Sequence, residues 1–187
     1  MEVFKDSMSK LLNRAITKLD GAEVAWSKRN IDDAYIDDAC FNVQQAMEMT
    51  LKYLIELSGN SYPRSHRIES LINELDNIGV CASQIDAIRG KAALYSAWEA
   101  ESRYLDDFAA LSSDVLEAIS LTKDLIEYAK SLSRRQVNEV EVYAKDNHLD
   151  YAMLVHDVYE ACPELLRRSS EEETAIAYWE IWKALHK

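Results

Sequence analysis

The chain has 187 residues, of which 48% are hydrophobic and 29% are charged, so it is not a disordered chain and is long enough for one domain with a sizeable core. Its formal net charge of −12 excludes non-specific DNA binding, which needs Lys and Arg to neutralise phosphates, and favours a basic protein partner. No run of about 18 apolar residues is present to span a membrane, and the first six residues lack the apolar run of a signal peptide, so we expect a cytoplasmic protein.

Helical spacing dominates the first third of the chain. Apolar residues at intervals of three and four predict a first helix over residues 8–26 and a longer one over residues 32–57. The acidic run at the start of the second helix predicts a solvated helix N-terminus, with a bound cation as the alternative; it consists of Asp32, Asp33, Asp37 and Asp38. Gly59 and Pro63 predict that this helix stops and a loop follows.

Three further apolar stripes follow. They predict helices over residues 68–78, 85–98 and 111–129, with a stop at Gly79 and a polar bend over residues 101–107. Neither glycine nor proline occurs between Gly90 and Cys162. The last of these helices could therefore either stop near Arg134-Arg135 or continue through Ala144. All of these patterns predict an all-α protein.

The end of the chain predicts a separate helical extension. A capping box at Ser169 or Ser170, with Glu172 or Glu173 three residues later, predicts a final helix, and two nearby tryptophans favour docking on the preceding helices. We therefore expect two parts, a helical bundle over residues 1–132 and a C-terminal helical extension over residues 133–187 that packs on it.

Several features over residues 8–132 together carry a resemblance to a known family. They are the long second helix with Gln44-Gln45-Ala46 at its centre and Leu51-Lys52-Tyr53-Leu54 at its end, His66 at the start of the third helix, and Arg103-Tyr104 before the last. This order of parts resembles the HEPN family of small helical domains. The resemblance implies an up-and-down bundle of four to five helices, commonly paired as a homodimer with a cleft between subunits, and often linked to nucleotide binding, toxin–antitoxin or other defence systems.

The resemblance also implies where a reaction would take place. Catalytic members of the family are metal-independent ribonucleases that carry an arginine followed after four to six residues by a histidine. The histidine moves a proton while the arginine holds the phosphate. Arg103 matches that arginine, but the positions for the histidine hold Phe108, Ala109 and Ala110, which transfer no proton. We therefore predict a non-catalytic binding module with no catalytic residue.

A cleft of this kind would bind a nucleotide, an RNA end or a basic protein such as a toxin or a nucleotidyltransferase-type partner. The residues predicted to contribute are Arg103, Tyr104, Gln45, Lys52 and His66.

Each of these residues also has a structural interpretation. Arg103 could bond helix-end carbonyls or pair with Glu99 one turn earlier. Gln45 and Lys52 could lie on a solvated helix face, and His66 could be a helix cap or a loop-packing residue.

Two other functions stay open. The first is a ribonuclease whose histidine is non-standard, such as His66. The second is a purely structural dimerisation protein, in which a flat stripe on the second helix packs across a two-fold axis; it consists of Ala39, Ala46 and Tyr53. No metal or cofactor is predicted, because His148 and His156 lack the spacing of a helical zinc pair and the cysteines form no Cys-x-x-Cys motif.

Overall fold

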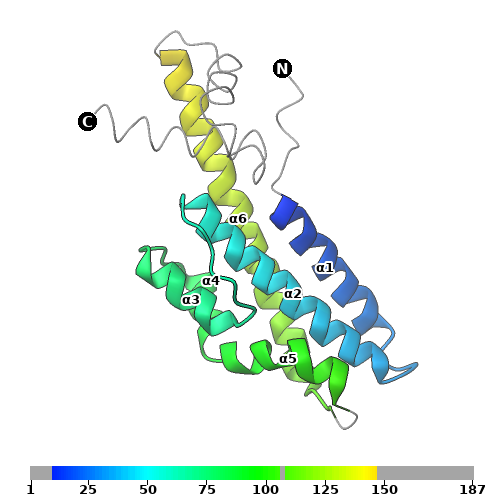
Figure 1. The fold of residues 1–187 in the computed structure, drawn as a ribbon. Coiled ribbons are helices and arrows are strands. Elements are labelled where there is room, and N and C mark those ends of the chain that lie inside the picture. The colour runs from blue at the N-terminus through cyan, green and yellow to red at the C-terminus, as the bar shows by residue number, and fades with distance from the viewer. Residues whose placement is uncertain (1–9, 106–107, 147–187) are drawn as a thin grey trace. The chain divides into compact units, whose positions relative to one another are not determined.

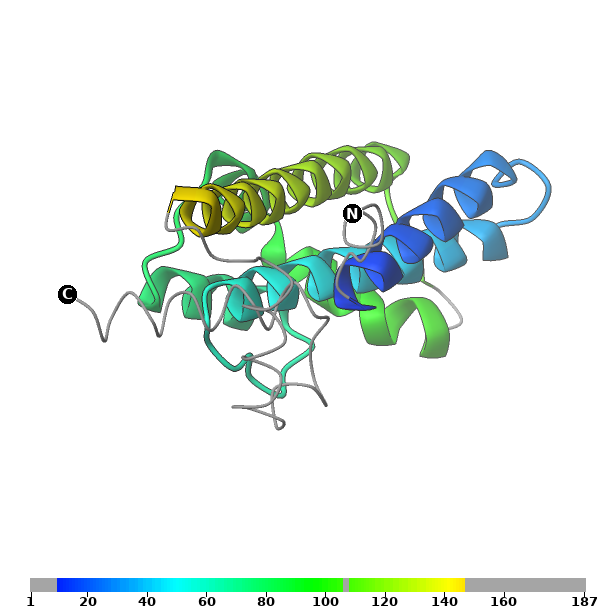
Figure 2. The ribbon, with the colours of Figure 1, turned by 90° about the horizontal axis from the view of Figure 1, so that it is seen from above.

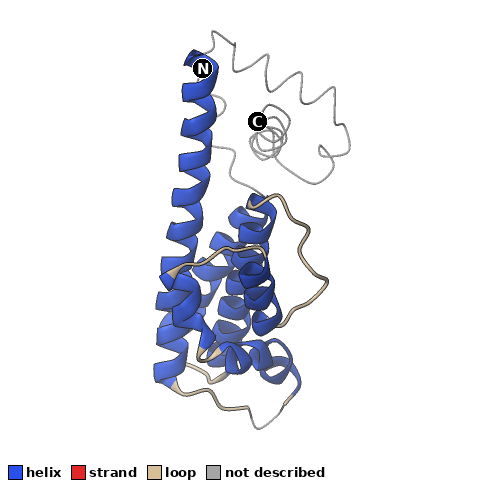
Figure 3. Ribbon diagram, turned by 90° about the vertical axis from the view of Figure 1, so that its left-hand side faces the viewer, coloured by secondary structure: helices blue, strands red, loops and turns tan. Residues whose placement is uncertain are grey.

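The computed structural model describes residues 10–105 and 108–146, and every regular element within them is an α-helix (Figure 1; Figure 3). The prediction of an all-α protein is confirmed. None of these helices is both long and apolar enough to cross a membrane. The elements are α1 (Lys10–Ser27), α2 (Ala34–Leu57), α3 (Ile68–Asn77), α4 (Ser83–Arg89), α5 (Ala92–Tyr104) and α6 (Ser112–Asp146).

Helix α2 is the centre of the compact unit that residues Leu11–Ala129 form. It lies antiparallel to α1 (Figures 1 and 2) and packs against both α3 and α5. It ends as predicted at Gly59, whose φ of 77° suits a residue without a Cβ. The Gly59 and Asn60 amides donate to the carbonyls of Glu56 and Ile55, which closes the last turn.

The flat stripe on α2 is not available for dimerisation. Because α2 is covered by neighbouring helices of its own chain, the side chains of Ala39, Ala46 and Tyr53 are all buried within it. The prediction that this stripe packs across a two-fold axis is therefore wrong. The 3.6-residue period shows which positions share a face, but it does not show which neighbour covers that face.

The stripe predicted as one helix over residues 85–98 is two helices, α4 and α5, which break at Gly90 and Lys91. The break brings the Lys91 ammonium to Asp114 and Glu117 of α6, so a tertiary ion-pair cluster forms where the helix stops. Helix α5 then continues through Tyr104, so the polar bend predicted over residues 101–107 begins later than expected.

Helix α6 confirms the longer of the two predicted courses, since it runs past residue 129 to Asp146. Leu111, predicted to lie in its apolar stripe, precedes the helix and is 68% exposed. The capping box and the two tryptophans of the predicted extension lie outside the described residues, and the boundary at residue 133 stays a prediction.

Candidate binding site

A buried carboxylate brings three of the five predicted site residues together. Glu48 is 3% exposed, and its Oε1 lies 2.8 Å from Lys52 Nζ and 3.0 Å from His66 Nδ1. The amides of Gln44 and Gln45 donate to its Oε2, at 3.1 and 3.4 Å. We call these five residues the Glu48 cluster. Spacings of three and four residues along α2 place four of them on one helix surface, and the loop before α3 supplies the fifth.

The contacts within the Glu48 cluster test the structural interpretations of Lys52 and His66. Lys52 is buried, with its Nζ 5.3 Å from the centre of the Tyr62 ring, so the alternative of a solvated helix face is wrong for this residue. His66 caps no helix. Its carbonyl accepts from Gln44 Nε2 and its ring bonds Glu48, so His66 ties its loop to α2 by hydrogen bonds while its side chain stays largely exposed. The first amide of α3, that of Ile68, donates to Ser96 Oγ instead.

Arg103 and Tyr104 lie away from the Glu48 cluster, at the end of α5. Arg103 Nε donates to the Glu99 carbonyl at 2.7 Å and its Nη2 pairs with the Glu99 carboxylate. The structural interpretation of Arg103 is therefore confirmed. Its guanidinium also lies over the rings of Phe41 and Tyr104, 4.9 and 5.0 Å from their centres. The positive charge of Arg103 is therefore largely neutralised by Glu99 of its own chain.

Sequence reasoning missed Glu48 as the residue that organises the site. The signal was present, because Glu48 and Lys52 are four residues apart on one helix, in the orientation that favours an ion pair. Phe41, Gln45, Glu48 and Lys52 follow one another at helical spacing, so a single surface of α2 runs from Arg103 to His66. Arg103 thus meets this surface at one end, and Gln45, Lys52 and His66 lie toward the other.

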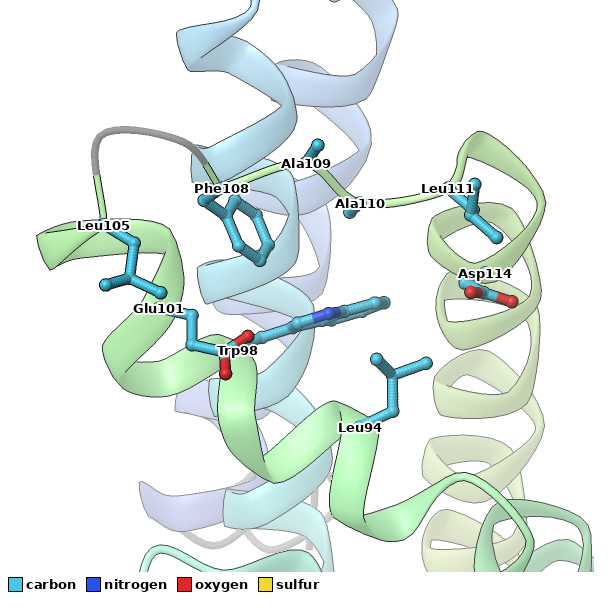
Figure 4. Close-up of a pocket in the computed structure, with 9 residues that line it drawn as sticks. All are labelled: Leu94, Trp98, Glu101, Leu105, Phe108, Ala109, Ala110, Leu111 and Asp114. Atoms are coloured by element: carbon cyan, nitrogen blue, oxygen red, sulfur yellow. The ribbon is translucent and has the colours of Figure 1, made fainter.

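A cavity of about 410 Å³ lies between the end of α5 and the start of α6. Phe108, Ala109 and Ala110 line it, and in Figure 4 the Trp98 indole lies at its centre, between Leu94 and Phe108. Leu105 and Glu101 of the α5 side, and Leu111 and Asp114 of the α6 side, complete the lining (Figure 4). Seven of the nine lining residues have apolar side chains and the two charged ones are carboxylates, while polar atoms contribute more of the exposed wall than apolar atoms do.

Beside this cavity, Tyr95 is fully buried against Trp98, with ring centres 5.1 Å apart. Its hydroxyl has no hydrogen-bond partner among the described residues, and burial, followed by the charge of Glu117, raises the pKa of Tyr95 to about 12. Removing an unsatisfied buried hydroxyl relieves its desolvation, so Tyr95→Phe is expected to raise the free energy of unfolding by about 1 kcal/mol in urea titrations. Tyr104→Phe, at an exposed ring, is the control and should change nothing. A loss of stability in Tyr95→Phe would mean that the hydroxyl has a partner.

Four carboxylates without an ion pair to any described residue gather where α2 begins. We call them the acidic turn; they belong to Asp32 and Asp33, which precede α2, and to Asp37 and Asp38 in its first turns. None of them forms an ion pair with another residue in the part of the chain that the structure describes. Burial, followed by the charges of Asp38, Asp33 and Asp32, raises the pKa of Asp37. The cluster therefore repels itself in the free protein.

The raised pKa of Asp37 predicts that the free energy of unfolding depends on pH. The folded chain holds the Asp37 proton more tightly than the unfolded chain, whose pKa is near 3.8, so stability falls as the pH rises through the window above 3.8. Asp37→Asn is expected to raise the free energy of unfolding by about 0.5 kcal/mol at neutral pH, and the gain should shrink as the pH approaches 3.8. Urea titrations at both pH values measure it, with exposed Asp124→Asn as control. A destabilised Asp37→Asn at neutral pH contradicts the repulsion.

Comparison with known proteins agrees with the order of parts in the sequence. The family model described as the HEPN domain matches residues 8–132, which is more than half of the chain and includes the Glu48 cluster, the cavity and the acidic turn. The resemblance seen in the sequence is confirmed. Neither a curated protein nor a solved structure matches the chain.

Proposed function

The chain belongs to the HEPN domain family, and on that premise we propose that it is a non-catalytic binding module, which acts as a homodimer and holds a basic protein partner in a toxin–antitoxin, immunity or defence setting. Nucleotide or RNA binding is the less favoured form of the same role. The observation that carries the choice is the acidic turn, whose charges find no cation among the described residues.

The distribution of basic side chains supports a protein partner over a polyphosphate. Phosphate binding needs lysines and arginines that are free to release counterions. In the described ranges, six of them are already in ion pairs with carboxylates; they are Lys52, Arg67, Arg89, Lys91, Arg103 and Lys123. A ligand phosphate would have to compete with each of those carboxylates, whereas a basic protein meets the acidic turn without such competition.

The surroundings of Arg103 support a role without a reaction. An arginine that stabilises a transferring phosphate must be free to form a fork with it. Here the guanidinium is paired with Glu99 and stacked on Phe41, and the positions where a proton-transferring histidine would stand contribute an apolar wall. Binding of an apolar and basic surface fits this end of the molecule better than proton transfer does.

The acidic turn supplies the test. The full chain is isolated from its native host with its bound proteins, and the association rate of the purified partner is measured at rising salt. We expect a basic partner whose association slows at least about tenfold when the acidic turn is neutralised by Asp33→Asn, Asp37→Asn and Asp38→Asn together. The matched control removes the same charge elsewhere, by Asp20→Asn, Glu74→Gln and Asp124→Asn, and should slow association less than about twofold.

Two outcomes overturn the choice of a basic protein partner. One is a partner without excess positive charge, and the other is an RNA that the purified chain binds or cleaves under the same conditions. Light scattering tests the homodimer separately, since the expected mass is twice that of the 21.4 kDa chain. A monomeric mass would contradict the dimer alone.

One observation favours a second candidate, the ribonuclease with a non-standard histidine. His66 receives a buried carboxylate at Nδ1 while its side chain is 66% exposed, and a carboxylate that orients an imidazole is a common arrangement in proton transfer. His66→Asn keeps a polar side chain and removes the titration. RNA cleavage by the parent chain that this variant loses would support the ribonuclease, and an inactive parent chain would exclude it.

A further inference from the structure

Exposed apolar side chains concentrate around the cavity between α5 and α6. Seven large hydrophobic residues are exposed in the described ranges, and three of them, Leu94, Leu105 and Leu111, line this one cavity. Tyr104, a fourth, is the neighbour of Leu105 and is 73% exposed. Single exposed apolar residues are ordinary, but a group around a cavity marks a place where something binds.

The charge at the rim specifies the occupant. Of the two carboxylates in the lining, that of Asp114 is held by Lys91 at 2.8 Å, while that of Glu101 forms no ion pair with any described residue. Trp98 beneath the cavity is buried, so the apolar contact available to a ligand comes from the exposed side chains of Leu94, Leu105 and Leu111. An apolar group that carries a positive charge beside it therefore fits this lining, and a negatively charged ligand does not.

The cavity and the acidic turn lie toward the same end of the helices. Asp37 and Phe41 are one helical turn apart on α2, and Phe41 contacts the Arg103 guanidinium at the end of α5. The next two residues along α5 are Tyr104 and Leu105, the second of which lines the cavity. Figures 1 and 2 show the start of α2 and the end of α5 at the same end of the helices. Unneutralised acids and a cavity with exposed leucines thus lie at the same end of the helices.

We propose that the cavity around Trp98 is the anchor pocket for the basic partner, and that it takes an apolar side chain flanked by lysine or arginine. The inference rests on the proposed function, because it names how that partner is held. The apolar side chain fills the space between Leu94, Leu105 and Phe108, its flanking cation pairs with Glu101, and further cations reach the acidic turn.

Trp98 itself reports occupancy of the pocket. The full chain is labelled with 5-fluorotryptophan, which gives one ¹⁹F resonance for each of its four tryptophans, and Trp98→Phe assigns the resonance of Trp98. The probe is the blocked peptide Lys-Lys-Leu-Lys-Lys. One matched peptide has alanine in place of leucine, and another has glutamate in place of every lysine. We expect a saturable shift of the Trp98 resonance with the first peptide only.

Variants of the chain separate pocket binding from general attraction. Ala110→Phe fills the cavity and is expected to weaken the leucine peptide at least about tenfold, and Glu101→Gln, a surface change that keeps the shape, should weaken it several-fold. Ala87→Phe, at an exposed position of α4 outside the lining, is the control and should leave binding unchanged. The inference is overturned if the alanine peptide binds as tightly as the leucine peptide. It is also overturned if Ala110→Phe binds the leucine peptide as tightly as the parent chain does.

The two proposals fail in different ways. If a basic partner depends on the acidic turn but binds Ala110→Phe as well as the parent, the anchor pocket is wrong and the proposed function stands. If the leucine peptide binds in the pocket while the isolated partner is not basic, the proposed function is wrong and the chemistry of the pocket stands.

Discussion

Replacing Glu48 with glutamine is expected to lower the free energy of unfolding by about 3 kcal/mol. The substitution keeps the size of the side chain but leaves the buried Lys52 ammonium without a countercharge. It also replaces one of the two acceptor oxygens, of which Oε2 accepts from Gln44 and Gln45 and Oε1 contacts Lys52 and His66, with an NH2 group. Urea titrations followed by circular dichroism measure the loss. Glu74→Gln on α3 is the matched control, and it should change stability by less than about 0.5 kcal/mol.

A second substitution separates the charge from the shape. In Glu48→Gln with Lys52→Met, the unpaired ammonium is gone and an apolar side chain of similar length fills its place, so part of the lost stability is expected to return. If the double variant is as unstable as the sum of its two single variants, Lys52 and Glu48 act independently, and their ion pair does not hold the loop before α3.

Replacing Trp98 with alanine is expected to lower the free energy of unfolding by about 3–5 kcal/mol. Trp98 is 1% exposed and packs against Tyr95 on α5, the helix that lies against both α2 and α3. Deleting its ring removes a large buried area and enlarges the neighbouring cavity, which neighbouring backbone does not collapse to fill. Thermal and urea unfolding measure the effect.

The control for this substitution is Leu116→Ala, which removes an apolar side chain that is already half exposed on α6. It should change stability by no more than about 0.5 kcal/mol. If Trp98→Ala loses no more than Leu116→Ala does, then Trp98 is not part of the packing between α5 and its neighbours, and the cavity extends into what is described here as core.

Helix periodicity is a local property, and it predicted well wherever local signals agreed. The stripe from Cys40 to Leu54 lies in the core, and Gly59 ends α2 in the conformation that favours glycine. The break between α4 and α5 was not predicted, because residues 85–98 keep a helical period across it. Lys91 leaves the helix where its ammonium meets Asp114 and Glu117, which lie more than 20 residues later in the chain.

The candidate site divides in the same way. Gln45, Lys52 and His66 of the Glu48 cluster were named as site residues from the sequence, whereas Glu48 was not, and the pairing of Arg103 with Glu99 was predicted from a one-turn spacing. The meeting of His66 with Glu48 and the cavity between α5 and α6 were not, because each joins segments separated by loops. No local pattern specifies the path of a loop.

The sequence by itself determined that this chain is helical, acidic and a member of its family. Only the tertiary structure decided that Lys52 is buried in an ion pair with Glu48 and that the flat stripe of α2 is covered by its own chain. It also decided that Phe108, Ala109 and Ala110 line a cavity. The reason is physical, since helix formation depends on neighbours within one or two turns, whereas burial and ion pairing depend on which distant surfaces the fold brings into contact.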